Sequence, residues 1–313
     1  MNKIIDPIDR SVLKRELNKD IFLRNTNNGN NEVYIFAGTE RPELMKEVGR
    51  VRELTFRDAG GGTGLEIDTD KFDVHPVHIH KQLIVWDPEN EEIIGGYRFY
   101  FPHKDSTHFE AEAMVSSSYF KFSDRFMKDY FPNTMELGRS FVQPQYQSRS
   151  MGRKSLFALD NLWDGLGALV IDNPHIRYLF GKVTMYPHFN SQARFMILYF
   201  LNKHFSDIDK LVIPHDPAKI DIPKKELDKI FKGKTFKEDF PVLIQEVRKL
   251  GENVPPLINA YMGLSPSMKT FGTFINHHFG DVEETGIMIT IKDLYIEKVN
   301  RHLASYREDY NLS

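Results

Sequence analysis

The stretch MELGRSFV, residues 135–142, places a carboxylate and a guanidinium inside an otherwise apolar strand pattern. Side chains three positions apart on a regular strand point to opposite faces, so Glu136 and Arg139 could not serve one site. Gly138 lies between them, and a glycine within a strand often marks a bulge that redirects a side chain. The pattern predicts a bulged strand that carries a reactive acid. The alternatives are an edge strand with both charges in solvent and a structural ion pair.

Charged residues also occur in three other patterns that suggest a site. Arg52 lies in VRELTF, Arg98 lies inside the strand-like GGYRF, and acids crowd GLEIDTDKFD at 64–73. The stretch QSRSMGRKS at 147–155 is basic and leads directly into a helix. Backbone N–H groups at a helix start, together with basic side chains, bind phosphate oxygens, so this stretch predicts a phosphate site. The alternative is an ordinary basic helix cap.

Two stretches invite a metal interpretation that their details disfavour. DTDKFD at 68–73 lacks the glycine and the terminal glutamate of an EF-hand loop. Recognition of a cationic amine explains these acids at least as well as a metal does. HPVHIH at 75–80 has no further ligands at matching positions, so partly exposed histidines are expected there. No metal site is predicted.

Hydrophobic periodicity indicates the elements that must position these residues. Strands are expected at 33–38, 82–87, 92–101, 135–142 and 176–185, and helices at 41–56, 152–170 and 190–204. The turn DPENE should join two of these strands in a hairpin. This order predicts an α/β or α+β domain with a mixed sheet. The predicted division is an N-terminal extension (1–31), a core (32–205), a lysine-rich helical insertion (206–250) and C-terminal strands with a helix that complete the core (251–313).

Composition excludes several classes of protein. The 313 residues contain no cysteine, which rules out disulfides and thiolate chemistry, and the net charge of −3 argues against nucleic-acid binding. The start MNKIIDPIDR does not resemble a secretory signal, and no apolar run approaches the length of a membrane span. A cytoplasmic protein is expected.

Together these motifs resemble a known family. The ordered set VR..TF, GLEIDTDKFD, GGYRF, ELGRSFV and QSRSMGRKS is similar to GNAT-fold acyltransferases that use acyl carrier protein. The nearest branch is the ornithine-lipid and glycine-lipid N-acyltransferases, often labelled hemolysin-like, and acyl-homoserine-lactone synthases are more distant. YLFGKVTM, VPPLINAYMGL and FGDVEETGIMITI resemble the lipid-forming branch. The tryptophan of the lactone synthases is missing from FRDAGGGTG, which disfavours a signalling lactone.

The resemblance implies a GNAT fold in which a bulged strand splays from its neighbour and admits the pantetheine arm of the donor. Gly138 would bend the strand, Glu136 would be the general base, and Arg139 would be a second catalytic position. Arg52, Asp70, Asp73 and Arg98 would bind or orient substrate. The pantetheine phosphate would bind at Arg149, Met151, Gly152, Arg153, Lys154 and Ser155, although Lys154 stands where many GNAT proteins have a small residue.

The expected activity is transfer of a long-chain acyl group, plain or 3-hydroxy, from acyl carrier protein to the amine of glycine or ornithine in aminolipid biosynthesis. The donor is an acyl-phosphopantetheine thioester, with acyl-coenzyme A as a second source, and no bound cofactor is required. Peripheral attachment to the inner face of the cytoplasmic membrane is expected through the lysines of 224–237, whose alternative is a solvated helix face. The remaining alternatives are a coenzyme A-dependent N-acetyltransferase and a non-catalytic module that binds acyl carrier protein or lipid.

Overall fold

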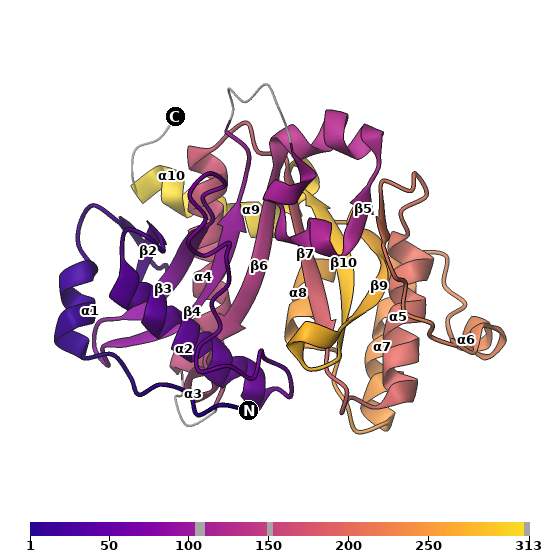
Figure 1. Ribbon diagram of the computed structural model, residues 1–313. Coiled ribbons are helices and arrows are strands. Elements are labelled where there is room, and N and C mark those ends of the chain that lie inside the picture. Colours follow the sequence, from indigo (N-terminus) through magenta and orange to yellow (C-terminus); the bar gives the residue numbers. More distant parts are fainter. Residues whose placement is uncertain (104–109, 149–152, 310–313) are drawn as a thin grey trace.

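A large mixed sheet organises the protein (Figure 1). The computed structural model describes residues 1–103, 110–148 and 153–309. The sheet order is β1-β2-β3-β4-β6-β7-β10-β9, antiparallel except between β6 and β7. Its strands are β1 (Phe22–Asn25), β2 (Glu32–Ala37), β3 (Lys81–Asp87), β4 (Glu92–Tyr100), β6 (Thr134–Val142), β7 (Tyr178–Met185), β9 (Lys269–Asn276) and β10 (Val282–Thr290). A second sheet pairs β5 (Phe120–Phe122) with β8 (Val212–Pro214). The predicted mixed sheet and the hairpin of β3 and β4 are confirmed.

Helices cover both faces of the large sheet, as a two-faced hydrophobic sheet requires. The buried side of α2 packs on β2, β3 and β4 in one core cluster, and α4 packs on the opposite face in another. The helices are α1 (Arg10–Glu16), α2 (Pro42–Asp58), α3 (Pro144–Gln147), α4 (Arg153–Asp172), α5 (Ser191–Phe205), α6 (Lys224–Ile230), α7 (Phe236–Lys249), α8 (Pro256–Met262), α9 (Ile296–Val299) and α10 (Ser305–Asp309).

The first and third predicted segments both contact the main core. Residues 1–31 supply α1 and the edge strand β1, and the buried side chain of Leu13 joins the cluster beneath α2. The helical pair expected in 206–250 is present as α6 and α7. Leu227 of α6 and Leu243 of α7 are buried in the same cluster as α4 and α5. Both segments therefore contribute side chains to the hydrophobic clusters that pack on the sheet.

Strand β6 is bulged and splays from β7, as the resemblance implied. The ladder between the two parallel strands contains three residue pairs and ends at Glu136 and Phe180. On the other side the register to β4 shifts between the pairs Arg98–Gly138 and Gly96–Phe141, which places an extra residue in β6. The expected position of the bend needs correction. Arg139, not Gly138, has the left-handed backbone, with φ of 49°.

Candidate active site

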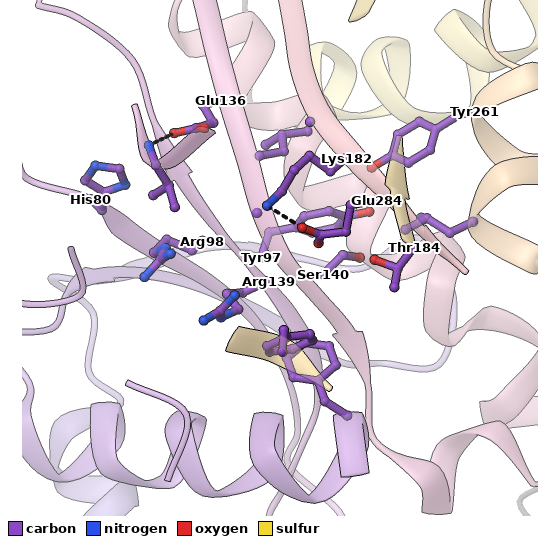
Figure 2. A pocket seen from close by; sticks show the side chains of 17 residues that line it. His80, Tyr97, Arg98, Glu136, Arg139, Ser140, Lys182, Thr184, Tyr261 and Glu284 are labelled. Carbon is purple, nitrogen blue, oxygen red and sulfur yellow. Dashed lines mark hydrogen bonds and ion pairs between the residues drawn. The ribbon is translucent and has the colours of Figure 1, made fainter. Parts of the chain in front are cut away.

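A pocket of about 80 Å³ opens where β6 and β7 diverge (Figure 2). Strands β4, β6, β7 and β10 all contribute to its wall, and α2 and α8 close its ends. Because β6 is no longer bonded to β7 here, the pocket contains residues from both faces of the sheet. The lining residues are Phe56, His80, Tyr97, Arg98, Val115, Glu136, Leu137, Gly138, Arg139, Ser140, Gly181, Lys182, Thr184, Leu257, Tyr261, Phe279 and Glu284.

Glu136 is a buried carboxylate that backbone amides hold at the mouth of the split. Its Oε2 accepts a hydrogen bond of 2.8 Å from the N–H of Val115, and its Oε1 accepts one of 2.8 Å from Ser116. Both donors begin the short 3₁₀ helix Val115–Ser118. Each carboxylate oxygen can accept more than one hydrogen, so Glu136 can still receive a proton from a ligand or a water. The alternative of a solvated edge strand is excluded, because β6 lies between β4 and β7 in the sheet.

Three arginines and three aspartates form a balanced network beside the pocket. Asp73 is fully buried and binds Arg52 at 3.0 Å and Arg98 at 3.1 Å. Asp70 binds Arg98 at 2.6 Å. The neighbouring aspartate, Asp68, binds Arg139 at 2.8 Å. The structure thus brings together five positions that the resemblance named from four separate stretches of sequence: Arg52, Asp70, Asp73, Arg98 and Arg139.

The network divides these residues into two groups. Arg98 and Arg139 reach the pocket wall, whereas Arg52 is fully buried and also hydrogen-bonds to Gln82. Burial by itself would raise the pKa of Asp73, but the charges of Arg52 and Arg98 outweigh it and hold the pKa well below its ordinary value. Arg52 and Asp73 therefore act as a rigid support, and Arg98 and Arg139 are the members that a ligand can touch.

The bulge explains how Arg139 reaches this network. An extra residue in β6 turns the Arg139 side chain toward Asp68, and its guanidinium also lies 4.8 Å from the centre of the Phe279 ring. The ion pair with Asp68 offsets the strain of a positive φ at a residue with a side chain. Glu136 and Arg139 can therefore line the same pocket, which a regular strand would forbid.

His80 corrects the expectation of partly exposed histidines. Its ring is buried, lies 2.9 Å from the carbonyl oxygen of Ala113 and stacks on Tyr100. Burial, aided by the charge of Arg98, lowers the pKa of His80 to about 4, so the ring is neutral near pH 7. Within residues 1–103, 110–148 and 153–309, no group of three or more His, Cys, Asp or Glu side chains could hold a metal ion.

A lysine and a glutamate form the opposite wall of the pocket. Lys182 on β7 points to Glu284 on β10 at 2.8 Å, and both line the split (Figure 2). Figure 2 shows this pair on the other side of β6 from Arg98 and Arg139 in that view. Sequence reasoning missed the pair. Lys182 is a lone cation in the strand pattern YLFGKVTM, and the same signal in GGYRF identified Arg98. This signal could therefore have identified Lys182.

The reverse face of the split carries three hydroxyl groups. Tyr97 on β4, Ser140 on β6 and Tyr261 on α8 all line the pocket and lie near one another. Burial raises the pKa of Tyr97 and raises that of Tyr261 well above its ordinary value, so both stay protonated. These groups can donate hydrogen bonds to a polar ligand inside the split but cannot act as bases near neutral pH.

Comparison with known proteins agrees with this geometry. The family model described as acetyltransferase (GNAT) domain matches residues 51–155. The chain is 52% identical over 309 residues to the glycine N(alpha)-acyltransferase of Phocaeicola vulgatus, covering 98% of this chain and 94% of that protein. It is also 52% identical over 312 residues to the glycine N(alpha)-acyltransferase of Bacteroides thetaiotaomicron, covering 99% and 92%. The chain belongs to this family of N-acyltransferases. The search of solved structures returned no significant match.

The predicted phosphate site of this acyltransferase falls largely outside the described residues. Arg149, Met151 and Gly152 lie in the gap at 149–152, and the side chains of Arg153 and Lys154 are also not described. Helix α4 begins at Arg153, so its start follows β6 and α3 along the chain, as the phosphate site requires. Ser155 lies half-buried in its first turn. Phosphate binding here remains a prediction.

In the part of the acyltransferase that the structure describes, no helix is both long and apolar enough to cross a bilayer.

Proposed function

We propose that this acyltransferase moves a long-chain acyl group, plain or 3-hydroxy, from acyl carrier protein to the α-amine of glycine, forming an N-acyl amino acid for lipid synthesis. The observation that carries the proposal is the split between β6 and β7, with Glu136 at its mouth and arginine and lysine groups on its two walls. In this proposal the thioester end of the donor's pantetheine arm enters the split. The names of the two relatives support glycine as the acceptor.

The reaction begins with deprotonation of the acceptor. An α-amino group has a pKa of about 8 and is mostly protonated at pH 7, so a base must remove a proton before the nitrogen can attack. Glu136 is the proposed base, acting directly or through a water. Its two amide partners fix the carboxylate at the pocket wall without consuming its capacity to accept another hydrogen.

Attack then forms the C–N bond and breaks the C–S bond of the thioester. The negative charge that develops on the thioester oxygen needs hydrogen-bond donors, and unpaired backbone N–H groups of β6 beyond Glu136 are the proposed source. The attacking nitrogen then loses its second proton, which the departing pantetheine thiolate takes, and Glu136 releases the first proton to solvent. Gly138 suits the entrance for this group, because a Cβ built there has no neighbour within 4 Å.

Peripheral membrane contact is a second part of the proposal. The product carries an acyl chain and would partition into a bilayer. All the lysines of the segment that contains α6 and the start of α7 face solvent: Lys224, Lys225, Lys229, Lys232, Lys234 and Lys237. Such a cluster binds anionic lipid by about 1 kcal/mol per lysine near the surface. We place the enzyme in the cytoplasm, at the inner face of the membrane, where acyl carrier protein is available.

A donor and acceptor matrix tests the proposal. Purified enzyme would be incubated with a long-chain 3-hydroxyacyl carrier protein or the plain acyl form, beside the matching acyl-coenzyme A and acetyl-coenzyme A. Each donor would be offered glycine, ornithine, alanine and serine, with N-acyl products measured by mass spectrometry. The proposal predicts N-acylglycine from the carrier-linked donors. Product only from acetyl-coenzyme A, or none from a folded protein that binds the carrier, would refute it.

A further inference from the structure

Strand pairing and two aromatic rings hold the ion pair between Lys182 and Glu284 in place. The two strands β7 and β10 pair over their whole length, so the pair rests on a rigid platform. The Lys182 ammonium lies 4.3 Å from the centre of the Tyr119 ring and 5.4 Å from that of Phe274. Both charged side chains retain some exposure, 15% for the lysine and 9% for the glutamate, and both line the pocket.

The hydrogen bonds around Glu284 leave one of its oxygens available. Lys182 and the amide of Asn276 both bind Oε2, at 2.8 Å and 3.0 Å. Among the described residues no hydrogen bond reaches Oε1. The Lys182 ammonium has three N–H donors, of which Glu284 takes one. Each member of the pair can therefore bind one further charged group without giving up its partner.

The arginines on the other wall are not equivalent. Arg98 is shared between Asp70 and Asp73, and Arg139 binds Asp68. A ligand carboxylate approaching them would meet three negative charges. The lysine and glutamate instead present one positive and one negative charge side by side, which suits a ligand with the opposite arrangement.

We propose that Lys182 and Glu284 form the acceptor subsite, in which Lys182 binds the carboxylate of a zwitterionic α-amino acid and Glu284 Oε1 binds its ammonium group. The inference rests on the proposed function and identifies the residues that select its acceptor. The amine would then lie between this pair and Glu136, which takes the proton. Amines without a carboxylate would bind poorly.

The size of the pocket limits the acceptor further. A water needs about 10–15 Å³ of such volume, and the 80 Å³ must also hold the reacting end of the donor thioester. Little room remains for a side chain on the acceptor. Tyr119 and Phe274 stack on each other, 4.6 Å between ring centres, and both rings contact the Lys182 ammonium, which limits its movement. The subsite should therefore favour glycine over larger amino acids.

The test compares glycine with glycinamide, which keeps the amine but lacks the carboxylate. Wild-type enzyme should prefer glycine, and Lys182→Met should raise the KM for glycine by about 10- to 100-fold, the worth of one charge-assisted hydrogen bond. The KM for glycinamide should hardly change, so the preference collapses. Lys203→Met is the matched control, because Lys203 forms an equally short ion pair with Asp239 on α5 and α7 and lies outside the pocket.

A second pair of variants separates binding from folding. Glu284→Gln should raise the KM for glycine and glycinamide together, because both carry the amine that Oε1 binds. Its control is Glu283→Gln on the same strand, where Glu283 binds Arg194 at 3.2 Å outside the pocket. All four variants would be checked by thermal melting, and glycine binding by calorimetry gives a readout that does not depend on turnover.

The outcomes are distinct. If the wild-type enzyme acylates glycine and Lys182→Met keeps the full preference over glycinamide, the subsite is wrong while the proposed function stands. If the wild-type enzyme acylates no amine, the proposed function fails and the subsite fails with it. Equal losses in Lys182→Met and Lys203→Met would show that the lysine is only structural, which also overturns the inference.

Discussion

Substitution of Asp73 by Asn should test the charged support directly. The Asp73 carboxylate accepts three hydrogen bonds, from Arg52 at 3.0 Å, from Gln82 at 2.9 Å and from the backbone N–H of Asp70 at 2.9 Å. It also forms an ion pair with Arg98 at 3.1 Å. An asparagine keeps the shape but replaces one oxygen with a donor, so at least one N–H group would face another N–H group. Two buried arginines would also lose their shared counter-charge.

The expected loss of stability in Asp73→Asn follows from the burial of this carboxylate. Breaking a buried ion pair by removing one partner costs about 3–5 kcal/mol, since the other charge is left buried. Native proteins are stable by about 5–15 kcal/mol, so the loss is a large share of the total. At about 2 °C per kcal/mol for a chain of this size, the melting temperature should fall by roughly 6–10 °C.

The assay is thermal and urea unfolding of wild-type protein, Asp73→Asn and Asp70→Asn at pH 7. Asp70 is the control, because it belongs to the same network but its side chain is 30% exposed and it should cost much less. A fall of less than 1 kcal/mol for Asp73→Asn, or equal falls for both variants, would refute the view that Asp73 is the centre of the support.

Three further outcomes are expected. The pKa of His80 is about 4 when folded and about 6.5 when unfolded, so the unfolded chain binds more protons between these values. From pH 7 to pH 4, wild-type protein should therefore lose about 3 kcal/mol more stability than His80→Gln, measured by urea unfolding, and equal losses would contradict this. Gly138→Ala should leave stability unchanged or raise it by up to about 1 kcal/mol. Its methyl group should enter the pocket and lower turnover, so a stable, fully active variant would contradict this. Arg139→Gly and Arg139→Ala both lose the ion pair with Asp68, but only alanine keeps the strain of φ 49°. The glycine variant should therefore be more stable by about 1 kcal/mol, and equal stabilities in urea would count against a strained bulge.

Much of the fold could be predicted from local patterns. Strands 82–87, 92–101 and 135–142 and helix 41–56 appear as β3, β4, β6 and α2 within a few residues, because their hydrophobic periods are clear. The bulge in β6 was predicted from a glycine, but Arg139 carries the unusual φ, since its ion pair with Asp68 depends on tertiary contacts. The burial of His80 was missed for the same reason.

From the sequence, only those site residues that the family resemblance named could be predicted. Glu136, Arg98 and Arg139 line the pocket as expected, whereas Lys182 and Glu284 were not selected. They are 102 positions apart in sequence, and only the pairing of β7 with β10 brings them together. A single sequence holds no signal for such a long-range pair beyond one lysine in an apolar strand.

The proposed reaction depends most on Glu136 as the base at the split. The decisive measurement is the rate of N-acylglycine formation by Glu136→Gln at saturating acyl carrier donor and glycine, beside wild-type enzyme of equal thermal stability. Glutamine keeps the size and still accepts one backbone N–H, but it cannot take a proton from the amine. General base catalysis predicts a loss of about 100- to 10,000-fold in kcat with carrier binding retained. A rate within a few-fold of wild type would contradict the account.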